Sequence, residues 1–277
     1  RAGVRLAASK GGKVTQVPLN LDSVSFSWPG SAERVLKDIS ATFAPGEFVG
    51  ILGPNGAGKS TILRTAAGFI RPDAGRVLSF GLDPSRVSRR RAARLAAFLP
   101  AALHVGFPLT VRELVSLGRT CHLEGVFESA RDRESVASAM EFSGVAQFAD
   151  RRYTELSAGE QRRVLIARAL AQESRLLLLD EPAANLDASQ AVRMLDGLAS
   201  MARRDGVSIV AAMHDLNLAL LVCDRVMLLN QGAVVGFGTP EEVMRYQALK
   251  DVFRCDFYVG RNELNGRLFV VPMKSPE

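Results

Sequence analysis

The segment from Gly53 to Thr61 constrains this chain more than any other part of its sequence. It reads Gly-Pro-Asn-Gly-Ala-Gly-Lys-Ser-Thr, the spacing of a glycine-rich loop that cradles phosphate groups. The apolar run 48–52 before it predicts a buried strand, and 62–67 after it predicts a helix that ends at Gly68. Glycines let the backbone curve around an anion, and the start of the helix adds its positive end. We therefore expect the chain to bind a nucleoside triphosphate.

The residues of this loop are expected to share the work of holding a triphosphate. The Lys59 ammonium can reach the β- and γ-phosphates, and the Ser60 hydroxyl can bind Mg²⁺. The alternative is a chance glycine turn before a helix, and the flanking strand and helix argue against it. The ATP-binding residues predicted in this segment are Gly53, Pro54, Asn55, Gly56, Ala57, Gly58, Lys59, Ser60 and Thr61.

Composition sets broad limits on the kind of protein. The 277 residues allow one large domain or two small ones, and the hydrophobic fraction of 47% is ordinary for a globular chain. The net charge of +6 suits nucleotides, nucleic acid or an anionic membrane surface without choosing among them. Cys121, Cys223 and Cys255 lie far apart, which favours a reducing compartment over a disulfide framework. No apolar stretch approaches the ~18 residues of a membrane span, so we expect a soluble, intracellular chain.

Strands alternate with helices along most of the chain, which predicts a mostly parallel α/β sheet. This pattern changes between about 100 and 155, where Thr110 is placed to cap one helix and 129–142 reads as another, and this predicts a helical insertion. Residues 246–277 suggest a hairpin packed on the core, with a role in dimerisation as the alternative.

Two acidic residues follow a buried strand and are expected to complete the phosphate site. Asp180 and Glu181 come directly after four leucines, and ligands bind beyond the carboxyl ends of such strands. Asp180 is expected to hold Mg²⁺, while Glu181 orients or deprotonates the attacking water. His214 ends the next buried strand and is expected to contact the γ-phosphate, although a lone histidine is more often structural. Glu181, His214 and Lys59 are the predicted catalytic residues.

These motifs, together with the segment Leu156-Ser157-Ala158-Gly159-Glu160-Gln161, resemble the ATPase subunit of an ATP-binding-cassette (ABC) transporter. The resemblance covers residues 19–245 in the family's order. It implies an α/β fold with a P-loop NTPase (RecA-like) core, an N-terminal antiparallel β-subdomain and a helical subdomain inserted at about 100–155. Residues 1–18 would be a flexible N-terminal extension, and 246–277 a C-terminal extension packed on the core.

The resemblance also implies an ATP-hydrolysing subunit that works as a head-to-tail dimer. In that family the signature segment, here Leu156, Ser157, Ala158, Gly159 and Glu160, caps the ATP held by the other copy. Asp187 matches the subunit-contacting loop, and Trp28 matches the aromatic residue that stacks on adenine. Trp28 also shares a strand face with Phe26, so a place in the core is its alternative role.

Two positions depart from the family's pattern. Ala158 stands where the signature usually has glycine, a small change that we expect to be tolerated. Ala101 stands where the family has a glutamine that completes Mg²⁺ and water contacts and senses the membrane partner. We therefore expect weakened Mg²⁺ dependence or weakened coupling to that partner.

The segments 107–111, 117–119 and 214–219 are similar to those of importers of iron–siderophore complexes, haem and cobalamin. This implies a peripheral subunit at the cytoplasmic face of the inner membrane, docked on a separate permease near 99–119 and served indirectly by a substrate-binding protein. ATP and Mg²⁺ are the implied ligands, and no nucleic acid is expected. The alternatives are a soluble ABC-type ATPase acting on nucleic acid or ribosomes, and the ATPase subunit of an exporter.

Overall fold

A six-stranded sheet forms the centre of the molecule in the computed structural model, which describes residues 16–103, 105–123 and 128–274. Its strand order is β5-β6-β7-β3-β8-β9. All neighbours are parallel except β9, which runs antiparallel to β8. The strands are β3 (Phe48–Leu52), β5 (Ala96–Leu99), β6 (Leu176–Asp180), β7 (Ser208–Ala212), β8 (Arg225–Asn230) and β9 (Ala233–Gly238).

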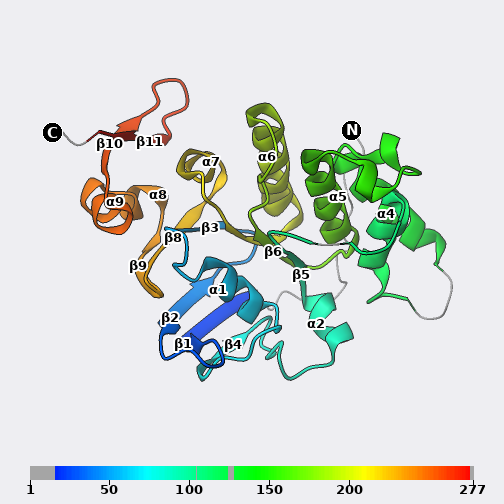
Figure 1. Cartoon of the computed structure of the whole chain (residues 1–277), viewed down its shortest axis with the longest axis horizontal. Coiled ribbons are helices and arrows are strands. Elements are labelled where there is room, and N and C mark those ends of the chain that lie inside the picture. The colour runs from blue at the N-terminus through cyan, green and yellow to red at the C-terminus, as the bar shows by residue number, and fades with distance from the viewer. Residues whose placement is uncertain (1–15, 104, 124–127, 275–277) are drawn as a thin grey trace.

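A second, antiparallel sheet lies on one side of this central sheet, with α1 (Lys59–Ala66) between the two (Figure 1). Its order is β2-β1-β4, and its strands are β1 (Leu19–Ser27), β2 (Arg34–Phe43) and β4 (Ala74–Leu78). Apolar side chains of both sheets and of α1 share one buried cluster. A parallel core beside an N-terminal antiparallel sheet confirms the fold class expected from the sequence.

Helices cover the opposite face of the central sheet. Three of them are α5 (Ala158–Ala171), α6 (Ala188–Asp205) and α7 (Leu216–Val222). The strand β6 shows why both faces need a cover, because Leu177 and Leu179 join the cluster under these helices while Leu176 and Leu178 join the cluster around α1. The continuous apolar run in the sequence is therefore the mark of a strand buried on both sides.

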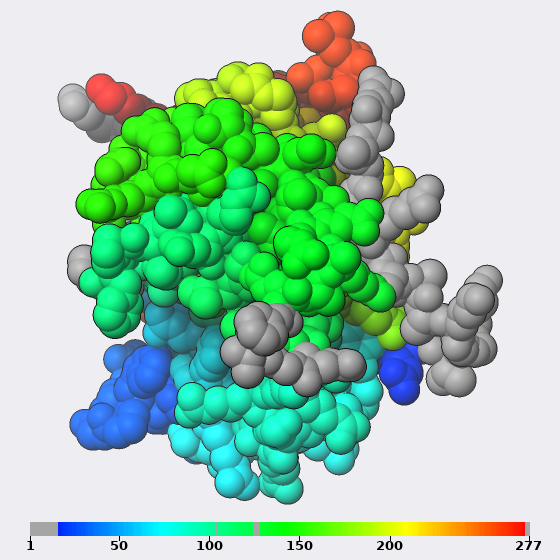
Figure 2. Space-filling view, turned by 90° about the vertical axis from the view of Figure 1, so that its right-hand side faces the viewer, coloured from blue at the N-terminus to red at the C-terminus, as the bar shows by residue number. Residues whose placement is uncertain are grey.

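The region between β5 and α5 is helical, as the sequence predicts. Its elements are α3 (Val111–Ser116), η1 (Leu117–Arg119), α4 (Ala130–Phe142), η2 (Ala146–Phe148) and η3 (Tyr153–Glu155). Thr110 and Ser129 cap α3 and α4 with reciprocal side-chain and backbone hydrogen bonds. Figure 2 shows this green region above the cyan residues around α2 (Arg89–Leu95).

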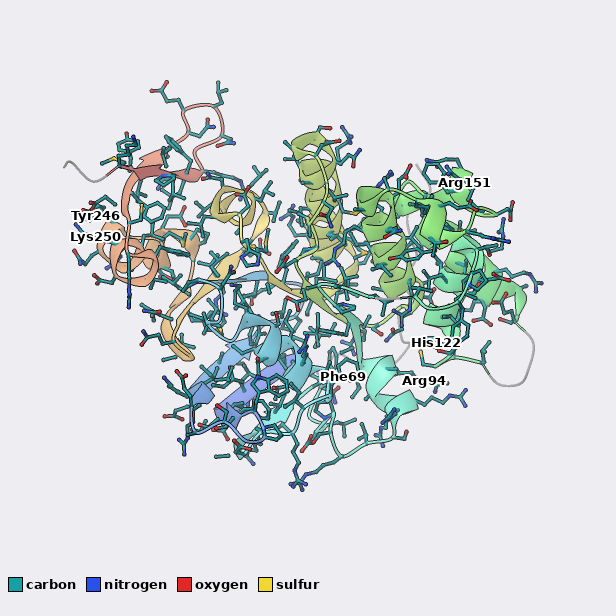
Figure 3. The ribbon with its side chains drawn as sticks, viewed as in Figure 1. Phe69, Arg94, His122, Arg151, Tyr246 and Lys250 are labelled. Carbon is teal, nitrogen blue, oxygen red and sulfur yellow. The ribbon has the colours of Figure 1, made fainter. Side chains whose placement is uncertain are left out.

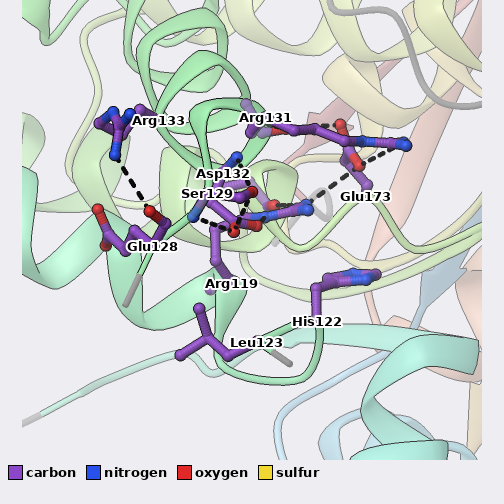
Figure 4. A network of polar contacts seen from close by, with 12 residues as sticks. Arg119, His122, Leu123, Glu128, Ser129, Arg131, Asp132, Arg133 and Glu173 are labelled. Carbon is purple, nitrogen blue, oxygen red and sulfur yellow. Dashed lines mark hydrogen bonds and ion pairs between the residues drawn. The ribbon is translucent and has the colours of Figure 1, made fainter. Parts of the chain in front are cut away.

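A buried ion network fastens the helical region to the far end of α5 (Figure 4). The Arg119 guanidinium is almost fully buried and donates to the Asp132 carboxylate at 2.8 Å and to the Ala171 carbonyl at 2.7 Å. It also lies 3.1 Å from the Glu173 carboxylate. The His122 ring nitrogen Nε2 lies 2.8 Å from the Gln172 carbonyl. These contacts hold the last turn of α5 against η1 and α4.

The chain ends in two short helices and a hairpin: α8 (Pro240–Val243), α9 (Tyr246–Phe253), β10 (Asp256–Arg261) and β11 (Leu268–Met273). The hairpin is the element expected from the sequence, whereas α9 is not anticipated by it. The Asn217 side chain on α7 exchanges two hydrogen bonds with the Val270 backbone. Val270 and Phe257 are buried in the cluster that also contains Ala219 and Leu220 of α7, so this segment packs on the helical side of the central sheet.

Candidate functional site

The phosphate loop joins β3 to α1 at the carboxyl edge of the central sheet. Gly53 and Gly58 have positive φ angles of 146° and 102°. A Cβ at Gly53 would lie 2.3 Å from the Leu229 carbonyl oxygen, and one at Gly58 would lie 2.9 Å from the Val35 carbonyl oxygen. Any residue other than glycine at these two positions would force the neighbouring backbone to move. The two glycines are therefore required for the shape of the loop.

The Lys59 side chain is buried inside the loop that it serves. Its Nζ donates to the Gly53 carbonyl at 2.7 Å and to the Pro54 carbonyl at 3.0 Å. Burial lowers the pKa of Lys59, and the negative charges of Glu181 and Asp180 oppose that effect. An ammonium has three N–H groups, so one remains for an anion in the loop.

Asp180 lies beneath the loop and has one oxygen engaged. Its Oδ1 accepts a hydrogen bond from the Ser60 hydroxyl at 2.9 Å, while its buried Oδ2 has no hydrogen-bond partner among the described residues. Burial raises the pKa of Asp180, and the bond from Ser60 acts against that rise. An orphaned carboxylate oxygen beside a hydroxyl is the hard oxygen donor set that Mg²⁺ takes.

A magnesium ion that is bound together with a nucleotide needs few protein ligands. Within residues 16–103, 105–123 and 128–274 no three His, Cys, Asp or Glu side chains converge as a closed metal cage. Mg²⁺ is bound through one or two protein oxygens and completes its shell with phosphates and water. Ser60 and Asp180 therefore suit a magnesium ion that arrives with a nucleotide.

Glu181 and His214 form a pair at the ends of β6 and β7. The His214 Nε2 atom lies 2.6 Å from the Glu181 Oε1 atom. Glu181 has a φ of 56°, in the left-handed region that glutamate rarely adopts, and its N–H donates to the Ala212 carbonyl at 3.0 Å. Backbone strain at such a position is typical of functional sites, where the surrounding structure holds it in place.

One cleft of about 330 Å³ gathers most of the predicted nucleotide and catalytic residues. Trp28 lies at its edge, 40% exposed, with its indole edge-on to the Phe26 ring at 5.0 Å. Gly53 and Asp180 are not among the lining residues, and Pro54 lines an adjoining hollow. The lining residues are Trp28, Val35, Asn55, Gly56, Ala57, Gly58, Lys59, Ser60, Thr61, Glu181 and His214.

The predicted signature segment forms a separate hollow. Ser157 caps α5, and its hydroxyl accepts from the Glu160 N–H while the Glu160 carboxylate accepts from the Ser157 N–H at 2.8 Å. These hydrogen bonds from Ser157 lower the pKa of Glu160. A Cβ at Gly159 would lie 2.7 Å from the Asn185 carbonyl, so the helix start packs directly on the loop before α6.

None of the residues that line this second hollow lines the cleft around the phosphate loop. Leu156 is buried beneath the segment and is not a lining residue. Asp187 caps α6 by accepting from the Gln190 N–H at 2.8 Å. The lining residues are Ser157, Ala158, Gly159, Glu160, Arg163, Asn185, Asp187 and Gln190. Within one chain the structure does not bring the signature segment to the phosphate loop.

Sequence reasoning missed one residue of the site, Arg162. It lies on α5, is 3% exposed, and its guanidinium donates to backbone carbonyls of the Asp180–Glu181 turn and of Pro100–Ala101. An arginine near a helix start reads as a solvent-exposed charge, and no local pattern indicates that it reaches two strand ends.

Two basic residues on α2 make specific contacts with the helical region. Arg90 and Arg94 both donate to the Cys121 carbonyl, at 3.0 Å and 2.8 Å. Figure 3 places Arg94, His122 and Phe69 around α2, at the side of the molecule away from the C-terminal hairpin. These arginines therefore tie α2 to the helical region.

The comparisons with known proteins all find proteins of ABC transporters. Residues 36–184 match the family model described as ABC transporter. The chain is 40% identical over 255 residues to the cobalamin import ATP-binding protein BtuD of Halobacterium salinarum, covering 92% of this chain but only 64% of that protein. It is 39% identical over 247 residues to the hemin import ATP-binding protein HmuV of Pseudomonas entomophila, covering 87% of this chain and 95% of that protein.

A solved structure gives the same result for the fold. The dimeric post-hydrolysis structure of the ATP-binding cassette MJ0796, bound to ADP and Pi, matches with a TM-score of 0.72 and 26% identity. The match covers 80% of this chain and 98% of that one.

Proposed function

This chain belongs to the ABC transporter family, and on that premise we propose that it is the ATP-binding and ATP-hydrolysing subunit of an ABC importer. The observation that carries the proposal is that one cleft is lined both by the phosphate loop, with Lys59 and Ser60, and by the Glu181–His214 pair. A cleft with phosphate donors on one wall and a carboxylate base on the other suits hydrolysis of a terminal phosphate.

The proposed reaction follows from the positions of these side chains. Loop N–H groups and Lys59 bind the phosphates, and Trp28 stacks on the adenine. Glu181 accepts a proton from a water whose oxygen attacks the γ-phosphorus, and the bond from that phosphorus to the bridging oxygen breaks to give ADP and phosphate. His214 holds the Glu181 carboxylate and contacts the γ-phosphate. Mg²⁺, held by Ser60 and Asp180, would neutralise charge on the phosphate oxygens.

We further propose that two copies complete two sites between them, head to tail. Ser157 to Glu160 present a capped helix start in a hollow that shares no lining residue with their own chain's cleft, and such a helix start can bind anions. The relative MJ0796 is described as a dimer in its ADP-bound state, which supports this arrangement. In the arrangement proposed for this chain, residues 156–160 of one copy cap the ATP of the other, and Asp187 contacts the partner.

The cargo proposed for this importer is a metal chelate such as haem, cobalamin or an iron–siderophore complex. The support is the naming of the relatives, which are ATP-binding proteins of cobalamin and hemin import. The chain would lie at the cytoplasmic face of the inner membrane, docked on a permease through residues near 99–119, with a substrate-binding protein delivering cargo. Phe107, in that segment, is 74% exposed. No helix within the described residues is long and apolar enough to span a membrane.

The domain boundaries are proposed on the same grounds. Residues 19–245 would form the ATPase domain, with the helical subdomain inserted at about 100–155. Residues 246–277 would form a C-terminal extension that packs on the core. The contact of β11 with α7 supports that last assignment.

The substitution Glu181→Gln tests the proposal. It removes the base but keeps the size and the polar contact, so ATP should bind normally while the turnover number falls by about 100-fold or more. Trp28 is the only tryptophan, so its fluorescence reports nucleotide binding directly. Sedimentation with ATP should show a stable dimer of Glu181→Gln, with Glu141→Gln, at an exposed position of α4, as the control that behaves like the wild type. Normal turnover by Glu181→Gln would remove Glu181 from the role of base.

A further inference from the structure

Arg162 is a buried cation at the meeting point of two neighbouring strands. It is the fifth residue of α5, and its side chain leaves the helix toward the carboxyl ends of β5 and β6. These strands are adjacent and parallel, with Leu99 paired to Leu179 at their ends. The residues that follow the two strands therefore leave the sheet side by side, one toward the helical region and one toward the catalytic pair.

The Arg162 guanidinium joins the two departing segments. On one side its Nη1 donates to the Pro100 carbonyl at 2.7 Å and to the Ala101 carbonyl at 3.2 Å. On the other side its Nη2 donates to the Glu181 carbonyl at 2.7 Å and also to the Asp180 carbonyl. A planar guanidinium carries donors in a fixed fork, so it holds both backbones in one geometry in a way that a single ammonium does not.

The charge of Arg162 is retained although it is buried. Burial lowers the pKa of Arg162 to about 10, and the carboxylates of Asp180 and Glu181 oppose that effect, so the group is positive at neutral pH. Its Nε has no hydrogen-bond partner among the described residues. Burying a cation with an unsatisfied donor costs stability. A residue that served only to fill space would not need to carry that cost.

We propose that Arg162 is a positioning residue that fixes the Asp180–Glu181 turn to the Pro100–Ala101 segment, so that displacement of this segment reaches the hydrolytic carboxylate through one side chain. This rests on the proposed ATP hydrolysis. Ala101 contributes no side-chain donor or acceptor, and the contact uses its carbonyl instead. The link between the helical region and the catalytic turn is therefore a side chain of α5.

Contacts at the other end of α5 extend the link from Arg162 to the helical region. Arg119 and His122 hold the carbonyls of Ala171 and Gln172 at the last turn of the helix. A helix of 14 residues is about 21 Å long, and its backbone hydrogen bonds make it stiff over that length. A displacement of the helical region around η1 and α4 therefore moves α5, and with it Arg162, as one body.

The test uses Arg162→Lys in the full chain, because lysine keeps the positive charge but reaches only one pair of carbonyls. The turnover number should fall by about 10- to 100-fold while the affinity for ATP, followed by Trp28 fluorescence, stays within about twofold. Arg168→Lys, the same substitution six positions further along α5, is the control and should leave both quantities unchanged. Arg162→Gln, which removes the charge, should be at least as slow as Arg162→Lys.

The following outcomes separate the positioning role of Arg162 from the proposed function. Unchanged turnover in Arg162→Lys and Arg162→Gln overturns the positioning role while leaving the proposed function intact. A parallel loss of ATP affinity and turnover also overturns it, because Arg162 would then be needed for the fold of the cleft as a whole. Absence of ATP hydrolysis in the wild type contradicts the proposed function itself. In the Glu181→Gln background, adding Arg162→Lys should leave the ATP-dependent dimer in place.

Discussion

Ala101 is a residue whose backbone, rather than its side chain, makes the contact with the rest of the site. The side chain is exposed, and its carbonyl accepts from Arg162. A glutamine here would add an amide oxygen that could contact Mg²⁺ and the attacking water. The alanine side chain has no oxygen for either contact.

Ala101→Gln is therefore expected to strengthen the dependence on Mg²⁺, with half-maximal turnover at a Mg²⁺ concentration several-fold lower. Titration of steady-state ATPase activity with Mg²⁺, with and without the permease, measures the effect. Ala102→Gln, one residue further along the exposed segment, serves as the matched control. If Ala101→Gln leaves both ATP turnover and its response to the permease unchanged, the side chain at 101 has no part in this link.

At the scale of the element, the start of α5 has a structural and a proposed functional task. The capping box of Ser157 and Glu160 satisfies N–H groups that the helix leaves open, as does the box of Thr239 and Glu242 at α8. The two boxes are alike in chemistry, but only the first lies in the hollow proposed to cap a partner's ATP.

Ser157→Ala and Thr239→Ala should each lower the free energy of unfolding by about 1 kcal/mol, because each loses one cap. Only Ser157→Ala should also lower the ATP turnover number, since it alone removes a hydroxyl from the proposed composite site. Urea unfolding and steady-state ATPase assays on both variants separate the two effects. Equal turnover in the two variants would confine Ser157 to the capping role.

At the scale of the whole molecule, the buried network around Arg119 makes stability depend on pH. Burial raises the pKa of Asp132, but the hydrogen bonds from Ser129 and Arg119, with the charge of Arg119, together outweigh it and lower that pKa to about 2. The group is more acidic in the folded chain than in the unfolded one. Its stabilising contribution is therefore present above about pH 4 and is lost as the pH falls toward 2.

Asp132→Asn should accordingly cost about 2 kcal/mol of unfolding free energy at pH 7, with the difference from the wild type shrinking as the pH falls below about 4. Urea unfolding of both proteins across a pH series measures it. Asp150→Asn, on an exposed side chain, is the control with little effect at any pH. A difference that stays constant from pH 7 to pH 3 would show that the Asp132 carboxylate charge is not what the network uses.

The sequence predicts the parts of this site that are local and fails where distant segments meet. The glycine loop, the acids after β6 and the cap at Ser157 are each readable, because a short run of residues sets both their conformation and their chemistry. Arg162 and Arg119 are not readable, since their burial depends on carbonyls and carboxylates contributed by other elements. The helix α9 was missed for a related reason, because in the sequence its residues could not be told apart from the hairpin that follows.

The position of β3 in the central sheet has a consequence for how the chain folds during synthesis. The strand that carries the phosphate loop is made early, yet Phe48 pairs with Ile209 and Val49 with Arg225. At typical rates of translation these partners leave the ribosome roughly 10 to 30 seconds after β3. For that interval a five-residue apolar strand has both edges open, the condition that favours mispairing and aggregation. Packing of the antiparallel sheet and α1 against β3 would shield one face of this strand until β7 and β8 arrive to pair with its edges.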